Sequence, residues 1–345
     1  MVRYAFLIFL VLISGCTIQG DGGASRTKTP FALELPTVFN PVEGATLETT
    51  SISPPPIVAL TFTPTATATI ADSTPTGKIV FTRQMFGENH DQICLMNADG
   101  SGQRRLTSDS SLEHFYSSLA PDGNSVVFST NQSGNFEIYE MDLKGNQTRL
   151  TFGFGDLYAP EISPDGRRIV FANGSGQYSS IWVMDRDGSN PHEIFSNYGS
   201  DAVDPTWSPD GMQILFALGV GNDRQLFIMN RDGTNVRLVS STFRTRGRSD
   251  WSPDGRTIAA YSGDPWMREI FLMRTDGSDL HQISSGGNVQ APSFSPDGQW
   301  IAFTGYIDRM QDEEGCEIYI MRLDGSDVRR LTNNTYCDWQ PRWGP

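Results

Sequence analysis

The sequence predicts an all-β protein, a six-bladed β-propeller of four-stranded blades, and three observations lead to this prediction. First, the tetrapeptide Ser-Pro-Asp-Gly, with one Ala-Pro-Asp-Gly variant, recurs with successive starts 43, 45, 44 and 43 residues apart. Second, an Asp-Gly or Lys-Gly pair recurs in phase with it. Third, short apolar runs separate the two signals. A period of this size is typical of a propeller blade. The five copies start at Ala120, Ser163, Ser208, Ser252 and Ser295.

The tetrapeptide joins the first two strands of each blade. Proline presets φ for the first corner of a type I turn, and glycine tolerates the left-handed conformation that follows. The run before the turn ends in an aromatic residue, for example Trp207 or Phe294, and an apolar run such as residues 214–216 follows it. Apolar runs bounded by turn residues are typical of strands buried on both faces.

A third strand, a second turn and a short fourth strand complete each repeat. The third-strand pattern is represented by residues 181–184 and 226–229, and the fourth strand by residues 105–107. We expect the Asp-Gly pairs to form type I′ turns, which require two positive φ values. Lys144-Gly145 is the weaker copy. The Asp-Gly pairs start at Asp99, Asp187, Asp232, Asp276 and Asp324.

The two ends of the repeat region together supply the remaining blade. Residues 78–81 form a second-strand pattern that no first strand precedes, and residues 340–345 form a first-strand pattern that no second strand follows. We therefore expect the C-terminal strand to close the first blade as its innermost strand. Closing the ring removes exposed sheet edges.

On these repeats, residues 78–345 resemble the TolB-like six-bladed propellers built from WD40-like (PD40) repeats. The resemblance implies the fold but no single activity, since such relatives include periplasmic translocation components, propeller domains of peptidases and polysaccharide lyases. TolB proteins carry an α/β domain before the propeller. In this sequence a Thr- and Pro-rich segment stands in that place.

Residues 1–15 predict a lipoprotein signal peptide. Arg3 precedes an apolar run at residues 4–13, which is too short to span a bilayer. The run ends in Ile13-Ser14-Gly15-Cys16, which resembles a bacterial lipobox. Several acyl chains on Cys16 would anchor the protein durably to the extracytoplasmic side of a membrane in the cell envelope. The alternative is an ordinary secretory signal followed by a coincidental cysteine.

Residues 16–77 predict a disordered linker. Residues 17–77 contain 14 threonines and 8 prolines, so the segment has little apolar surface to bury. A random coil of this length spans roughly 45 Å. The linker would hold the propeller, which we expect to be a monomer, away from the membrane.

The chain is acidic, with a net charge of −14 that becomes −15 if cleavage before Cys16 removes Arg3. Ten of its 40 acidic residues lie in the two turn motifs, so much of the charge serves turns. Nucleic acid is not an expected partner, because its binding requires basic surfaces.

Cysteine usage suggests an oxidising compartment. Cys316 opens the third strand of the last repeat, and Cys337 precedes the closing strand. Both positions belong to connections that emerge on the same face of a propeller, so we predict a Cys316–Cys337 disulfide. Cys94 falls within a strand and is expected to be a buried free thiol.

Motifs of catalysis are weak, and we expect a protein without enzymatic activity, cofactor or metal. The sequence has no Gly-x-Ser-x-Gly elbow, and no residues for a hydrolase domain follow the closing strand. His192-Glu193 lacks the second histidine of a zinc helix, since position 196 is serine. The four histidines are expected to be split between the two faces. Carboxylates at residues 308–315 could hold calcium or remain solvated.

Candidate binding residues fall on the face that carries the second-to-third and fourth-to-first strand connections. Aromatic side chains there suit a protein partner or a sugar ring, or they anchor loops. Three arginines interrupt the acidic sequence; they suit carboxylate or phosphate groups, or pair with neighbouring loop acids. The candidates are Tyr116, Tyr158, Tyr178, Trp266, Trp339, Arg244, Arg246 and Arg248.

These observations favour a noncatalytic, membrane-anchored lipoprotein whose propeller binds another envelope protein or an extracellular polymer. The alternative is a carbohydrate-active protein, either a sugar binder or an unusual polysaccharide lyase.

Overall fold

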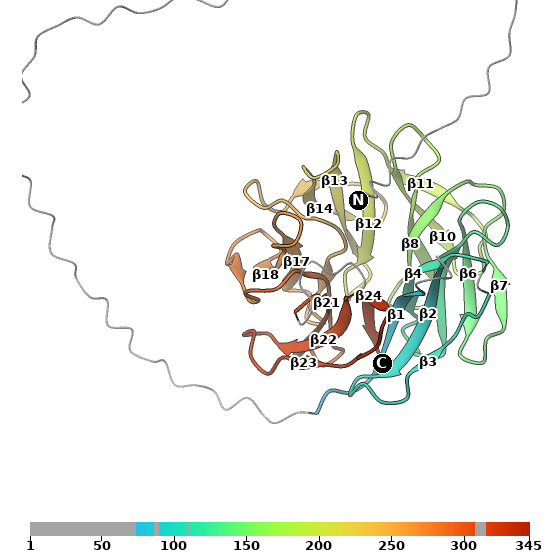
Figure 1. The fold of residues 1–345 in the computed structure, drawn as a ribbon. Coiled ribbons are helices and arrows are strands. Elements are labelled where there is room, and N and C mark those ends of the chain that lie inside the picture. Colours follow the sequence, from blue (N-terminus) through green and yellow to red (C-terminus); the bar gives the residue numbers. More distant parts are fainter. Residues whose placement is uncertain (1–73, 86–89, 110, 308–314) are drawn as a thin grey trace, which may run out of the picture. The chain divides into compact units, whose positions relative to one another are not determined.

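The computed structural model describes residues 74–85, 90–109, 111–307 and 315–345. Within these ranges, 24 strands form six four-stranded antiparallel sheets, which are arranged as the blades of a ring (Figure 1). The predicted all-β six-bladed propeller is confirmed. The described part of the chain has no helix able to cross a membrane. The predicted signal peptide, Cys16, most of the linker and nearly all of the acidic insertion at 308–315 lie outside the described residues.

The strands follow one another through the blades in chain order. Blade one contains β24 (Cys337–Gly344), β1 (Lys78–Met85), β2 (His90–Asn97) and β3 (Arg104–Arg105). Blade two contains β4 (His114–Leu119), β5 (Ser125–Thr130), β6 (Glu137–Asp142) and β7 (Gln147–Arg149). Blade three contains β8 (Leu157–Ile162), β9 (Arg168–Asn173), β10 (Ser180–Asp185) and β11 (His192–Phe195).

The second half of the ring repeats this order. Blade four contains β12 (Asp201–Trp207), β13 (Gln213–Gly219), β14 (Gln225–Asn230) and β15 (Arg237–Leu238). Blade five contains β16 (Asp250–Trp251), β17 (Thr257–Ser262), β18 (Glu269–Arg274) and β19 (His281–Gln282). Blade six contains β20 (Val289–Phe294), β21 (Trp300–Gly305), β22 (Glu317–Arg322) and β23 (Arg329–Arg330).

The Ser-Pro-Asp-Gly turn has the conformation that its residues predict. In blade three, Gly166 N donates to Ser163 O at 2.8 Å, and Gly166 has a φ of 72°. Asp165 accepts hydrogen bonds from Ser163 Oγ at 2.6 Å and Arg167 N at 3.1 Å. The bond from Ser163 lowers the pKa of the Asp165 carboxyl. This carboxylate is therefore engaged within its own turn.

The Asp-Gly turns differ from the type I′ turns that we expected. Gly100 has a φ of 84°, whereas Asp99 is not among the residues with positive φ. Gly100 N donates to Asn97 O and Asn97 N to Ser101 O, which is the pattern of a type I turn followed by a bulge at glycine. Asp99 accepts from Ser101 N and Ser101 Oγ, at 2.9 and 2.6 Å. The Asp-Gly pair therefore forms a hairpin, as predicted, but the turn is a type I turn with a bulge, which the aspartate side chain stabilises.

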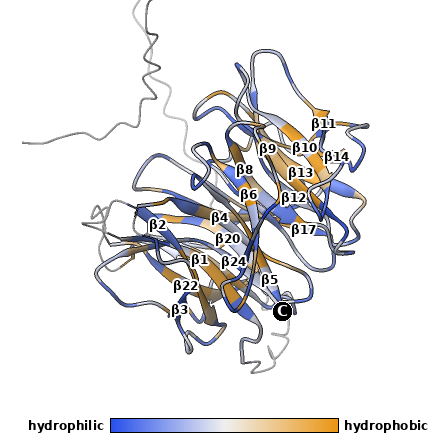
Figure 2. Ribbon diagram, turned by 90° about the vertical axis from the view of Figure 1, so that its right-hand side faces the viewer, coloured by the Kyte–Doolittle hydropathy of each residue, from blue (hydrophilic) through white to orange (hydrophobic). Residues whose placement is uncertain are grey.

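The hydrophobic core lies between neighbouring blades, and Figure 2 shows the apolar residues concentrated on the strands. Six clusters of buried side chains occupy the six interfaces of the described ring. Phe81, Phe128 and Phe216 on the second strands are fully buried. Burial on both faces of these strands follows because each blade is packed between two others.

The chain's C-terminal strand closes the ring, as predicted. β24 pairs antiparallel with β1, and Lys78 lies opposite Gly344. The described domain also extends slightly before Lys78, since Trp343 Nε1 donates to Thr76 O at 2.8 Å and Ala98 N to Gly77 O at 3.0 Å. The last residues assigned to the linker are therefore held by blade one.

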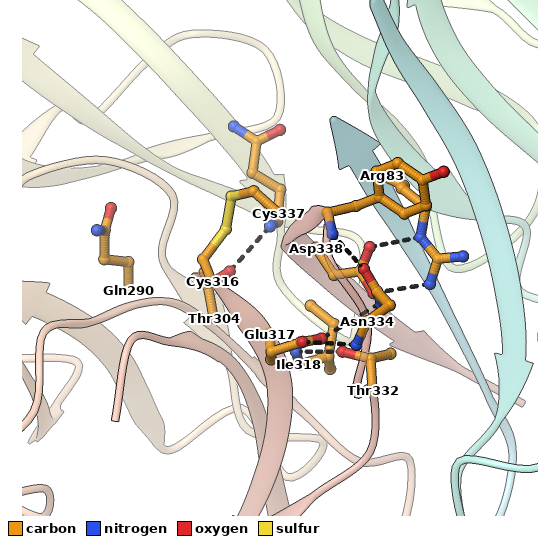
Figure 3. The surroundings of a disulfide bond; sticks show 12 residues. Arg83, Gln290, Thr304, Cys316, Glu317, Ile318, Thr332, Asn334, Cys337 and Asp338 are labelled. Atoms are coloured by element: carbon orange, nitrogen blue, oxygen red, sulfur yellow. Dashed lines mark hydrogen bonds and ion pairs between the residues drawn. A yellow bond between two sulfur atoms is a disulfide. The ribbon is translucent and has the colours of Figure 1, made fainter. Parts of the chain in front are cut away.

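A disulfide joins the closing strand to blade six (Figure 3). It links Cys316 and Cys337, the pair expected from the sequence, with their Cα atoms 4.5 Å apart. Asp338, next to Cys337, accepts from Arg83 Nε at 2.6 Å and Arg83 Nη2 at 2.8 Å. Asn334 Nδ2 donates to the same carboxylate at 2.8 Å. Cys94 is a buried free cysteine.

Candidate functional site

The innermost strands carry a repeated irregularity that shapes the central channel. In five blades the register of the innermost strand shifts. A residue with φ between 51° and 56° lies at each of these shifts: Tyr116, Ala159, Asp204, Ala291 and Gln340. The equivalent position in blade five, three residues before Trp251, is Arg248. A non-glycine residue rarely adopts positive φ, so its recurrence shows that the ring imposes this local geometry.

Five of these six residues line a cavity of about 240 Å³ in the channel. The cavity also receives side chains from second-to-third strand connections, including Arg224 and Tyr306, so it lies toward the face that those connections form. Its lining comprises Tyr116, Asp204, Arg224, Arg246, Gly247, Arg248, Tyr261, Gln290, Ala291, Thr304, Tyr306, Trp339 and Gln340. We call it the channel-mouth cavity.

Positive charge dominates the lining, with three arginines and one carboxylate. Arg224 Nη2 lies 3.5 Å from Asp201 Oδ2. Arg246 donates to Gly263 O at 2.8 Å and Asn222 O at 2.6 Å. The Arg224 guanidinium is thus held by the start of β12, and that of Arg246 by two loop carbonyls. Burial raises the pKa of the Asp204 carboxyl, so the single acid is easier to neutralise than an exposed one.

Arg248 is the least satisfied of the three arginines. The residue is 4% exposed, and its Nη1 donates to Ser117 O in blade two at 3.4 Å. Its Nε and Nη2 atoms have no hydrogen-bond partner among the described residues. Its Cζ lies 5.6 Å from the ring centroid of Tyr116. Burial and the nearby charge of Arg342 lower the pKa of Arg248 to about 10, so it is still a cation at neutral pH.

Neutral polar groups complete the cavity. Burial raises the pKa values of the Tyr116 and Tyr261 phenols, which stay protonated. Tyr261 Oη donates to Arg246 O at 3.0 Å. Trp339 Nε1 and Gln340 Oε1 are buried without a partner in the described part of the chain. One donor and one acceptor on residues of the same lining as Arg248 are therefore unsatisfied.

A second polar layer lies two residues further along the innermost strands. Arg342 Nη1 is 3.1 Å from Asp250 Oδ1, and Arg342 Nη2 is 3.6 Å from Glu161 Oε2. Glu161 accepts from Trp207 N at 2.9 Å, and Asp250 from Phe294 N at 2.8 Å. These bonds connect blades one, three, four, five and six. Both carboxylates of this layer are engaged, and only Arg342 Nε has no hydrogen-bond partner among the described residues, so the layer serves to link the blades.

Comparisons with known proteins agree with this architecture. Residues 153–311 match the family model described as the TolB beta propeller domain, PD40. TolB from Acinetobacter baumannii is similar in structure, with a TM-score of 0.65 and 20% identity over 78% of this chain and 67% of that one. The described domain has the six-bladed β-propeller fold of TolB.

Two further structures are similar to the propeller domain of this chain. A protein assigned as TolB from Agrobacterium tumefaciens has a TM-score of 0.59 and 20% identity, over 79% of this chain and all of that one. Hydrazine synthase of Kuenenia stuttgartiensis has a TM-score of 0.63 and 15% identity, over 78% of this chain and 46% of that one. No curated protein matches the sequence. Likeness at this level of identity establishes the fold, which hosts unrelated functions.

The TolB-like propeller brings four of the sequence candidates together. Tyr116, Arg246, Arg248 and Trp339 line the channel-mouth cavity. Tyr158 lies outside its lining, with its ring centroid 6.2 Å from that of Tyr116. Tyr116, Arg248 and Trp339 come from three distant parts of the sequence and meet because the innermost strands converge on one axis.

The remaining candidates lie outside the cavity lining of the TolB-like propeller. Trp266 packs edge-on against Tyr306, with ring centroids 5.4 Å apart, and so supports the wall. Arg244 pairs with Asp223 at 2.6 Å, which is the alternative that we considered for these arginines. Tyr178 is half-buried on the β9–β10 connection.

Sequence reasoning missed several lining residues, among them Asp204, Tyr261 and Gln340. The sequence does contain a signal for some of them. An apolar or aromatic residue lies at or next to the end of each innermost strand, and the residue three positions before it marks the channel. Applied to Trp207, Trp251 and Trp343, this rule finds Asp204, Arg248 and Gln340. Tyr261 carries no such signal, because it enters the cavity from the end of a second strand.

Proposed function

We propose that this chain is a noncatalytic, lipid-anchored protein of the bacterial cell envelope whose propeller binds an envelope protein through the face around the channel-mouth cavity. The TolB-like fold supports a protein-binding role in the envelope. The leader that ends at Cys16 and the Thr- and Pro-rich linker support display on the extracytoplasmic side of a membrane.

The observation that carries the proposal is the set of exposed apolar side chains on this face. Four are more than half exposed: Tyr198 at 98%, Phe152 at 68%, Met267 at 67% and Val220 at 58%. All four lie on fourth-to-first or second-to-third strand connections, the same kinds of connection that surround the cavity. Large apolar side chains around a polar centre are typical of protein-binding surfaces.

Capture of a partner from solubilised envelopes by the full chain tests this proposal. We expect one specific protein to be recovered by the wild type and lost with Tyr198→Ser combined with Met267→Ser. Met212→Ser is the matched control, because Met212 is 51% exposed but lies on a first turn, at the opposite face. Recovery of no partner, together with measurable turnover of a glycan, would contradict the proposal.

The anchor is tested separately with Cys16→Ser. We expect the wild type to incorporate labelled fatty acid and to fractionate with membranes, and the variant to do neither. Recovery of an unacylated wild-type chain in the soluble fraction would point to an ordinary secretory signal instead.

A second candidate function, binding of a carbohydrate, is favoured by one feature of the cavity. Trp339 and Tyr306 line it beside the carboxamides of Gln290 and Gln340. Aromatic rings and neutral polar groups together suit a sugar ring. A glycan array probed with the full chain distinguishes the two candidates, since a protein-binding face predicts no glycan-specific signal.

A further inference from the structure

Arg248 carries more hydrogen-bonding capacity than its surroundings use. It extends from blade five to Ser117 O of blade two, the opposite blade of the ring, and this contact at 3.4 Å is long for a hydrogen bond. Two further nitrogens, Nε and Nη2, have no partner in the described part of the chain. Leaving a buried cation unpaired is costly, so a complementary anion would be bound favourably here.

The protein itself shows how such a pair of nitrogens is satisfied. Arg83 holds Asp338 with the same two atoms, Nε to Oδ1 at 2.6 Å and Nη2 to Oδ2 at 2.8 Å. This side-on fork matches the spacing of a carboxylate's two oxygens. Arg248 lines the channel-mouth cavity, and the same two atoms of its guanidinium are not paired with any carboxylate of the described residues.

The surroundings of Arg248 suit one negative charge. The cavity holds three arginines, and its volume of about 240 Å³ accommodates a carboxylate together with the atoms that carry it. Trp339 Nε1 and Gln340 Oε1 can bond polar atoms next to the carboxylate. Asp204, in the same cavity, disfavours a second negative charge, as on a phosphate dianion.

From this geometry we propose that the channel-mouth cavity is a carboxylate-binding site, in which Arg248 Nε and Nη2 pair with one acidic group of the propeller's ligand. The inference rests on the proposed function only in assigning the carboxylate to the macromolecule that this face binds. It deepens that function by naming the chemical group recognised at the centre of the face.

Titration of the full chain with matched small molecules tests the site. The probes are N-acetylaspartate N-methylamide and methyl glucuronide, each compared with its neutral counterpart, the asparagine derivative and methyl glucoside. Binding is followed by nuclear magnetic resonance of the arginine Nε–H groups. We expect at least one acid to bind and to shift the Arg248 signal, and its neutral counterpart to bind about 10- to 100-fold more weakly. The aspartate derivative binding would indicate a protein ligand, and the glucuronide a polymer; both support the site.

Variants separate this role from a structural one. Arg248→Gln should weaken binding of the acid about 10- to 100-fold while the chain remains folded in circular dichroism. Arg244→Gln is the matched control, because it removes the same charge from the same loop at a residue paired outside the cavity, and it should change affinity less than about twofold. Asp204→Asn should tighten binding, since it removes the competing charge.

Several outcomes would overturn the inference: equal affinity for acid and neutral probe, tighter binding of inorganic phosphate, or wild-type affinity in a folded Arg248→Gln chain. Weaker binding by Asp204→Asn would also overturn it, since Asp204 would then act with Arg248 on the ligand. The proposed function is separable, because a partner captured equally well by Arg248→Gln leaves that function intact and removes only the carboxylate site.

Discussion

At the scale of single residues, the buried charges of this propeller fall into two groups. Arg83 and Arg342 are paired with buried or partly buried carboxylates, and these pairs connect strands that are distant in the chain. Arg248 is buried without such a pair among the described residues. Since removing one member of a buried pair leaves an uncompensated charge, the two groups should respond differently to substitution.

Asp338→Asn is expected to destabilise the fold by about 3 kcal/mol, because it leaves the Arg83 guanidinium without its bidentate partner. The Asp338 side chain is fully buried. Asp223→Asn breaks the pair with Arg244, but the Asp223 side chain is 81% exposed, so that loss should stay below about 0.5 kcal/mol. Urea unfolding of both variants measures the difference. Equal effects would show that burial does not govern these pairs.

His114 should make stability depend on pH. The residue is 1% exposed and burial lowers its pKa to about 4, whereas the unfolded value is about 6.5. Between these values the unfolded chain binds a proton that the folded chain does not, so stability is lost as pH falls through this window. Between pH 7 and pH 4 this protonation should lower the free energy of unfolding of the wild type by about 3 kcal/mol. His114→Leu should abolish this part of the pH dependence.

The measurement for His114 is the difference in unfolding free energy between wild type and variant at several pH values. His192→Leu serves as the control, because His192 is exposed. An unchanged difference from pH 7 to pH 4 would show that His114 is protonated equally in both states.

At the scale of elements, the two turns of a blade use glycine for different reasons. In the first turn of blade four, a Cβ on Gly211 would find its nearest atom, Pro164 Cδ, at 3.7 Å, which is an ordinary contact. In the second turn, a Cβ on Gly233 would overlap Ile194 O of blade three. Gly188, Gly277 and Gly325 meet the preceding blade in the same way. The second turn is therefore also a packing contact between blades.

Gly211→Ala and Gly233→Ala form a matched pair that tests this distinction. Both glycines have positive φ, 68° and 83°, so each substitution carries a conformational cost of about 1 kcal/mol. Gly233→Ala adds a clash with backbone and should cost about 2 kcal/mol more. Thermal unfolding compares the two. Similar melting temperatures would mean that the neighbouring blade yields without cost.

At the scale of the whole molecule, the ring is held closed at the joint between its two ends. β24 belongs to blade one, and the Cys316–Cys337 disulfide ties its start to blade six. The bond closes a short loop of 21 residues in sequence separation. It restricts the unfolded chain and keeps the closing strand beside blade six.

Cys316→Ser combined with Cys337→Ser should lower the unfolding free energy by about 3 kcal/mol. Reductant should destabilise the wild type by a similar amount and leave the double variant unchanged. Cys94→Ser keeps the disulfide and should retain the wild-type response to reductant. Insensitivity of the wild type to reductant in unfolding experiments would contradict this role.

Much of the architecture is determined by sequence alone. The turn tetrapeptide, the second turn and the apolar runs repeat with one period, and these are local signals because turn and strand preferences depend on neighbouring residues. The incomplete repeats at Lys78 and at residues 340–345 determine how the ring closes. The number of blades and the strand that completes blade one follow from these signals.

Only the tertiary structure decides which side chains meet and which remain unsatisfied. The sequence does not distinguish the three arginines at positions 244, 246 and 248. In the structure Arg244 pairs with Asp223, and loop carbonyls hold Arg246. Arg248 is buried with two nitrogens that have no partner among the described residues. Asp204 and Gln340 reach the same cavity from blades four and one. The physical reason is that the channel exists only when six blades close around one axis, so its contacts depend on long-range geometry that no local pattern encodes.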